Sequence, residues 1–118
     1  SLNEIVKAQT GKSLDEVTDI VLEGVTVSII TPDTLTFSKF SYGKLVVSSS
    51  TSSVTVFDRQ LNETGRTIAE TNLNSNIKNV IREARNGNKI LTYSLTVTTT
   101  SVVPQATWKI VSNVALTP

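Results

Sequence analysis

Apolar residues at the start of the chain recur at the spacing of an amphipathic helix. Leu2, Ile5 and Val6 fall on one helical face, and Gly11 then interrupts the pattern. The sequence therefore predicts a short first helix with one apolar face.

A second helical pattern follows directly. Ser13 and Glu16 have the S-x-x-E spacing of a capping box, in which each side chain bonds the other residue's backbone N–H. The apolar positions that accompany it lie three or four residues apart: Leu14, Val17 and Val21. We expect a helix over 14–22 and, with the first helix, a helical N-terminal arm over 1–23.

Between residues 25 and 57, apolar and hydroxyl side chains alternate, which is the period of strands with one buried face. The apolar positions form four short runs: 25–29, 35–37, 45–47 and 54–57. We expect the last two runs to pair as a hairpin over 43–57. The tip of this hairpin consists of small hydroxyl residues: Ser48, Ser49, Ser50, Thr51, Ser52 and Ser53. Because such residues pack poorly, we expect the tip to be mobile or to be ordered by a neighbour.

A polar connector over 58–70 precedes the clearest helical pattern in the chain. One apolar stripe at helical spacing runs over 72–86: Leu73, Ile77, Val80, Ile81 and Ala84. Asn86 and Gly87 are residues that commonly end a helix in the left-handed conformation. The stripe predicts a helix that packs on a sheet.

Two long alternating runs over 91–98 and 106–116 complete the chain, each with one apolar and one hydroxyl-rich face. We therefore predict a single domain over 1–118 that is mainly β with one inserted amphipathic helix, and so α+β in class. Residues 24–118 are expected to form a β-sandwich or a curled antiparallel sheet, with the helix over 72–86 inserted after the fourth strand.

Composition removes much of the usual catalytic chemistry. The chain has no His, no Cys and no Met, so it cannot supply a Ser-His or Cys-His nucleophile pair, a zinc site of the common His/Cys kind or a disulfide. Most of its acidic residues fall at expected helix starts and turns, where capping explains them. Its five glycines stand singly, so none forms a phosphate-binding loop. We expect no enzyme, no catalytic or metal site and no cofactor.

The charge balance bears on possible partners. A formal net charge of +1 lacks the basic field that nonspecific nucleic-acid binding needs, and Lys78, Arg82 and Arg85 are expected to form a solvated helix face. No stretch approaches the roughly 20 apolar residues of a membrane span, and residues 1–12 lack the apolar core of an export leader. We therefore expect neither a nucleic-acid partner nor a membrane.

Hydroxyl residues supply 32 of the 118 positions, and many lie on expected strand faces. A strand edge without Lys, Pro or bulges invites pairing with other strands, and few protective residues are present: Lys44, Pro104 and Lys109. The pattern favours assembly of the chain with copies of itself.

The order of the predicted elements resembles the tail-tube class of bacteriophage virion proteins and its relatives in contractile injection systems. The resemblance rests on a set of strands, the hairpin over 43–57, the helix over 72–86 and two final strands, and covers roughly 24–116. It implies a subunit of stacked hexameric rings whose hairpin reaches a neighbouring ring, in a virion assembled in the host cytoplasm. A baseplate, head-decoration or head-completion protein fits the same order.

We therefore predict a non-enzymatic structural subunit of a phage virion or phage-like particle. Its expected partners are copies of itself, in a ring or tube, and other virion proteins. The predicted interface comprises one face of the first helix and the hairpin tip: Leu2, Ile5, Val6, Ser48, Ser49, Ser50, Thr51, Ser52 and Ser53. The alternative is an adhesin-like or carbohydrate-binding β-sandwich that uses Tyr42 or Trp108.

Overall fold

The structure is a computed structural model that describes residues 1–117, with side chains described over 1–115. Over this range the chain is mainly β with two α-helices, and so α+β in class, as the sequence predicts. In chain order the helices and strands are α1 (Leu2–Thr10), β1 (Asp19–Thr31), β2 (Phe40–Ser48), β3 (Ser53–Gln60), β4 (Thr67–Glu70), α2 (Ile77–Asn86), β5 (Thr92–Thr99) and β6 (Thr107–Thr117). Short 3-10 turns lie at Leu14–Glu16 and Phe37–Lys39.

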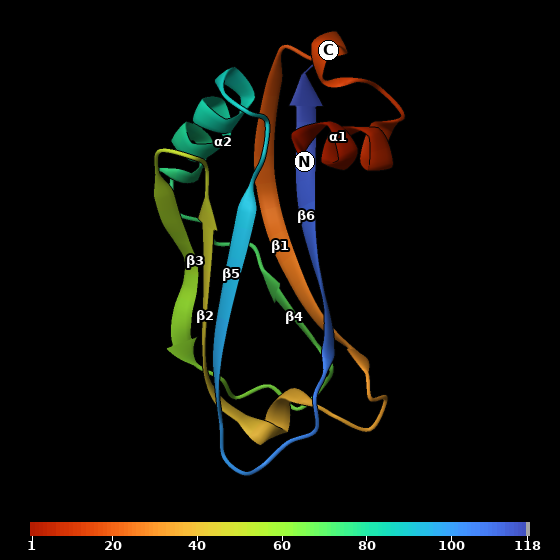
Figure 1. Ribbon diagram of the computed structural model, residues 1–118, viewed down its shortest axis with the longest axis vertical. Coiled ribbons are helices and arrows are strands. Elements are labelled where there is room, and N and C mark those ends of the chain that lie inside the picture. Colours follow the sequence, from red (N-terminus) through yellow and green to blue (C-terminus); the bar gives the residue numbers. More distant parts are fainter. Residues whose placement is uncertain (118) are drawn as a thin grey trace.

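The strands form two antiparallel three-stranded sheets, which run along the long axis of the molecule in Figure 1. One sheet has the order β4-β1-β6 and the other has the order β3-β2-β5. Buried apolar residues from both sheets and both helices belong to one core cluster, in which Val25, Leu45 and Val47 are almost completely enclosed. The body is elongated, with extents of 46 × 26 × 22 Å.

β1 is central in its sheet, but its two neighbours differ in length. It pairs with β6 over almost its whole length and with β4 only over 25–28. The register with β6 shifts between Leu22 and Gly24, as in a β-bulge. A Cβ atom on Gly24 would lie 3.1 Å from the carbonyl oxygen of Glu70, so the glycine allows the end of β4 to approach closely. Before that point, residues 19–24 have no strand on the β4 side among the residues that the structure describes.

α2 packs on β1, β2 and β3 with the apolar stripe that the sequence predicts. The stripe residues Ile77, Val80, Ile81 and Ala84 are buried. The helix begins at residue 77 and not at 72, because residues 74–76 form a turn in which the Asn74 side chain accepts the Asn76 N–H at 2.9 Å.

The helix predicted over 14–22 is wrong. One 3-10 turn at Leu14–Glu16 takes its place and β1 begins at Asp19, so the helical arm predicted over 1–23 ends at Glu16. The capping box does form, since the Ser13 N–H donates to the Glu16 carboxylate at 3.1 Å. Beyond it, the long pairing with β6 supports an extended backbone, whereas an isolated helix of this length would be only marginally stable.

Two further differences concern short segments. The run over 35–37 leads into a 3-10 turn and is not a strand, and the Phe37 N–H donates to the Gly65 carbonyl at 2.8 Å. β4 lies in the predicted polar connector, where Ile68 is its one buried residue and too little alternation exists to reveal a strand. The hairpin of β2 and β3 and the long strands β5 and β6 are confirmed.

Candidate assembly surface

The core is closed on one flank of the molecule and open on the other. Where β3, β4 and α2 lie, inward apolar side chains such as Val54, Phe57 and Ile68 are at most 8 % exposed. By contrast, none of the described apolar side chains of β5 and β6 is fully buried: Tyr93, Leu95, Val97, Trp108, Ile110, Val111, Val114 and Ala115. We refer to the surface along β5 and β6 as the open flank.

β5 is an edge strand with free backbone groups on its outer side. The carbonyls of Thr92 and Thr98 accept hydrogen bonds from hydroxyls on β2, so even-numbered residues direct their peptide groups toward β2. By the alternation of an antiparallel strand, Tyr93, Leu95 and Val97 direct theirs away from β2. No strand among residues 1–117 pairs with that side.

β5 also lacks the side chains that usually protect a sheet edge. From Thr92 to Thr99 it contains no charge, no Pro and no Gly, and most of its residues are β-branched or aromatic. The side chains on its other face, which include Ser94 and Thr96, are exposed hydroxyls. The hydroxyl face that the sequence predicts for this strand is therefore confirmed.

α1 covers part of the β6 edge through one side chain. The Gln9 amide donates to the Ser112 carbonyl, and its oxygen accepts the Val114 N–H at 3.0 Å. Since one amide provides both a donor and an acceptor, Gln9 takes the place of a neighbouring strand at these two residues. By alternation, Trp108 and Ile110 direct their peptide groups to the same side, beyond the reach of Gln9. No sequence signal pointed to Gln9, because its contact spans 103 residues.

A hydrogen bond joins the two edge strands across the sheets. The Tyr93 hydroxyl on β5 bonds the hydroxyl of Ser112 on β6, which is buried. Burial raises the pKa of Tyr93, and the bond to Ser112 partly opposes that rise. This polar contact links β5 to β6 across the two sheets.

The predicted interface on the first helix is largely occupied by the chain itself. Leu2 and Val6 are at most 1 % exposed within the core, so they have no surface to offer a second copy in this conformation. The Leu2 N–H also donates to the Lys89 carbonyl at 2.9 Å. Ile5 is half-buried and lies beside β6 in a shallow depression.

The hairpin tip is held by α2 of the same chain. Hydroxyls of Ser49, Thr51 and Ser52 all donate to the Glu83 carboxylate, the first two at 3.2 and 2.9 Å. The bonds from Ser52 and Thr51 hold the pKa of Glu83 below its ordinary value. The tip was expected to be mobile or to be ordered by another molecule. Instead it is held by α2 of the same chain, a contact that no local pattern in the sequence reveals.

The other tip residues lie around this contact. Ser48 donates to the Thr92 carbonyl at 3.4 Å, and Ser53 pairs with Ser48 at the base of the turn. Ser50 and Ser53 are exposed. The tip therefore presents polar, exposed hydroxyls, and its role in an interface stays a prediction.

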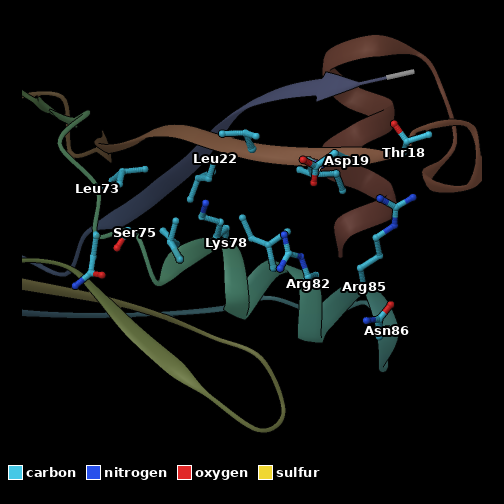
Figure 2. Close-up of a pocket in the computed structure, with 14 residues that line it drawn as sticks. Thr18, Asp19, Leu22, Leu73, Ser75, Lys78, Arg82, Arg85 and Asn86 are labelled. Carbon is cyan, nitrogen blue, oxygen red and sulfur yellow. Dashed lines mark hydrogen bonds between the residues drawn. The ribbon is translucent and has the colours of Figure 1, made fainter.

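A groove of about 500 Å³ lies between α2 and the first part of β1 (Figure 2). Lys78, Arg82 and Arg85 line it from α2, and Asp19 and Leu22 line it from β1. Arg85 is half-buried and donates to two backbone carbonyls of the segment before β1. The basic stripe that was expected to be a solvated face thus forms one wall of a groove, which we name the α2–β1 groove.

The aromatic residues proposed for sugar binding do not form a platform. The ring of Trp108 packs against Phe37 and Phe40, with centroids 5.8 and 5.5 Å apart, and is half-buried. Tyr42 is also half-buried and belongs to β2. Exposed, grouped rings are the usual feature of sugar-binding faces, so the geometry does not favour this alternative.

Among residues 1–117 no three acidic side chains gather in a way that could hold a metal ion. The helices of the same range are too short or too polar to cross a membrane. Comparison of the chain with protein-family models, curated proteins and solved structures finds no match.

Proposed function

We propose that the chain is a structural subunit that assembles with copies of itself into a phage virion or phage-like particle, with a tail tube as the best-fitting component. The observation that carries the proposal is the open flank, where an uncharged strand edge lies beside half-exposed apolar side chains. Together, free peptide groups and apolar side chains are what strand addition at a subunit interface uses.

In the proposed contact, β5 of one copy adds to the β6 edge of the next. β5 offers the peptide groups of Tyr93, Leu95 and Val97, and β6 offers those of Trp108 and Ile110. A contact that uses β5 of one copy and β6 of the next is heterologous, and its repetition generates a ring or a filament. A tube subunit needs a contact of this kind.

The proposal includes the finer description of the fold. We infer that the two sheets stack as a β-sandwich of the tail-tube kind, in a particle that is assembled in the host cytoplasm. Two observations support this inference: both sheets contribute to one core cluster, and α2 follows β4 and precedes β5 along the chain. Other virion proteins are then expected to contact the finished assembly.

The test is light scattering coupled to size-exclusion chromatography over roughly 1 to 500 μM of the full chain, a range that covers micromolar association. Electron microscopy of the concentrated sample accompanies it. Ser94→Lys with Thr96→Lys places two cations on exposed positions of β5 without touching the core. We expect the wild type to assemble as concentration rises and this double variant to stay monomeric.

The matched control is Thr55→Lys with Gln60→Lys, which adds the same charge at exposed positions of the other edge strand of that sheet, β3. It is expected to assemble like the wild type. A wild type that stays monomeric by both methods would refute the proposal, as would equal assembly of the β5 variant.

A further inference from the structure

The first part of β1 presents a second free strand edge, separate from the open flank. β4 ends at Glu70, opposite Val25, so β1 continues over 19–24 without a partner on this side among residues 1–117. The α2–β1 groove lies along this part of the strand (Figure 2). Edge and groove together form a place where a strand could be added in line with β4.

The hydrogen bonds of β6 show which peptide groups of β1 face the groove. The Val114 N–H donates to Gln9, away from β1, so its pairing partner Leu22 directs its own groups away from β6. Ile20 lies two residues earlier and has the same orientation. The Ile20 N–H donates to the Asp19 carboxylate at 2.9 Å. Within the described chain, the Ile20 carbonyl and both backbone groups of Leu22 have no hydrogen-bond partner.

The charges that line the groove are mainly positive. Lys78 and Arg82 are exposed and form no ion pair among residues 1–117, and Arg85 adds a third cation. Asp19 is the acidic residue of the lining. Its carboxylate accepts the Ile20 N–H and forms no ion pair with the cations on α2 within the described chain, so the three cations outnumber the one acid of the lining. The volume of about 500 Å³ lies within the range of small binding clefts.

We propose that the α2–β1 groove binds an extended acidic peptide segment of a partner protein, which adds to β1 as a strand. The free groups of Ile20 and Leu22 pair with the backbone of the segment. Alternate side chains of the segment point toward α2, and acidic residues there meet Lys78 and Arg82. A small free anion would bind Lys78 and Arg82 but would leave the backbone groups of the strand edge unpaired. An acidic strand binds the cations and also pairs with the strand edge.

The probe is a labelled hexapeptide of alternating Glu and Val, blocked at both ends, and its binding to the full chain is measured by fluorescence anisotropy. We expect a Kd in the micromolar to submillimolar range, roughly 10 μM to 500 μM. Lys78→Glu with Arg82→Glu is expected to weaken binding at least tenfold. Lys7→Glu with Lys44→Glu makes the same charge change at exposed positions on α1 and β2, and should bind like the wild type.

Two N-methylated forms of the hexapeptide separate strand addition from simple charge attraction. In each form, every second amide nitrogen of the peptide carries a methyl group. When the acidic side chains of the peptide face α2, only one of the two forms keeps the N–H groups that face β1. We expect that form to bind and the other to lose at least tenfold. NMR of the labelled chain should show the Leu22 amide among the most shifted signals.

Several results would overturn the inference. One is the absence of hexapeptide binding at about 1 mM. Another is that Lys78→Glu with Arg82→Glu binds the hexapeptide as tightly as the wild type does. A third is that both methylated forms bind with the same affinity. Preferential binding of a single-stranded oligonucleotide would overturn it as well. The groove variant is expected to assemble like the wild type, because it leaves β5 and β6 unchanged, so failure here and failure of the proposed assembly are distinguishable.

Discussion

Replacing Gln9 by alanine tests whether one side chain protects part of the β6 edge. In the wild type its amide donates to the Ser112 carbonyl and accepts the Val114 N–H. Gln9→Ala removes both hydrogen bonds and frees two more peptide groups on the open flank. We therefore expect opposite effects on two properties, with a lower free energy of unfolding and stronger self-association.

The size of the stability loss follows from the two bonds. A neutral hydrogen bond contributes about 0.5–1.5 kcal/mol, and because Gln9 is exposed, water replaces part of each bond, which places the loss near about 1–2 kcal/mol. Alanine recovers a few tenths of a kcal/mol through its higher helix propensity. The net loss is about 1 kcal/mol, which corresponds to roughly 4 °C in Tm for a domain of this size.

The assay is equilibrium unfolding in urea followed by circular dichroism. With a slope of about 1–2 kcal/mol/M, the midpoint should fall by roughly 0.5–1 M. Lys7→Ala changes an exposed residue of the same helix and should leave the midpoint within about 0.2 M. An unchanged midpoint for Gln9→Ala, or an equal fall in Lys7→Ala, would refute the edge-protecting role of this amide.

Three further outcomes are expected. Leu45→Ala empties a position that is 0 % exposed between both sheets and should cost about 2–5 kcal/mol in urea unfolding, and a loss below about 1 kcal/mol would contradict the core assignment. Hydrogen bonds from Ser52 and Thr51 lower the pKa of Glu83 in the folded chain. Their contribution to the stability of the tip is therefore present above the ordinary glutamate pKa of about 4.3. It is lost as the pH falls through the lower pKa that Glu83 has in the folded chain. The NMR amide shifts of both tip residues should titrate there in the wild type and stay constant in Glu83→Gln. Ser112→Ala removes the hydrogen bond that opposes the effect of burial on Tyr93, so the pKa of Tyr93 should rise further. Phenolate absorbance measures this pKa, and a fall would contradict the contact.

The strands and the second helix could be predicted because their patterns are local. β5 and β6 alternate over many residues, and α2 has a stripe of four buried side chains. The segment over 14–22 is different, since Val17 and Val21 fit a helical spacing and would also lie on one face of a strand. Pairing between Asp19 and Thr117 decides between the two, and no local pattern contains that pairing.

The candidate surface could be predicted only in part. The uncharged composition of β5 is visible in the sequence, but its place at a sheet edge depends on which strands pair. The tip residues were visible as a run of hydroxyls, whereas their bonds to Glu83 cross more than 30 residues of chain. The contacts that protect an edge or hold a loop are long-range, so periodicity cannot reveal them.

The two flanks differ in how their strand edges are protected, and this difference bears on assembly. At the β3 and β4 flank, Arg59 forms ion pairs with Glu63 at 2.9 Å and Glu70 at 3.6 Å and lies over the Phe57 ring. Such charges on an edge oppose pairing with a further strand. Gln9 protects β6 at its α1 end and Lys109 is an exposed charge farther along β6, whereas β5 carries no charge at all. A chain with every edge free would pair in many ways, whereas the charges at the β3 and β4 flank confine the proposed pairing of copies to β5 and β6.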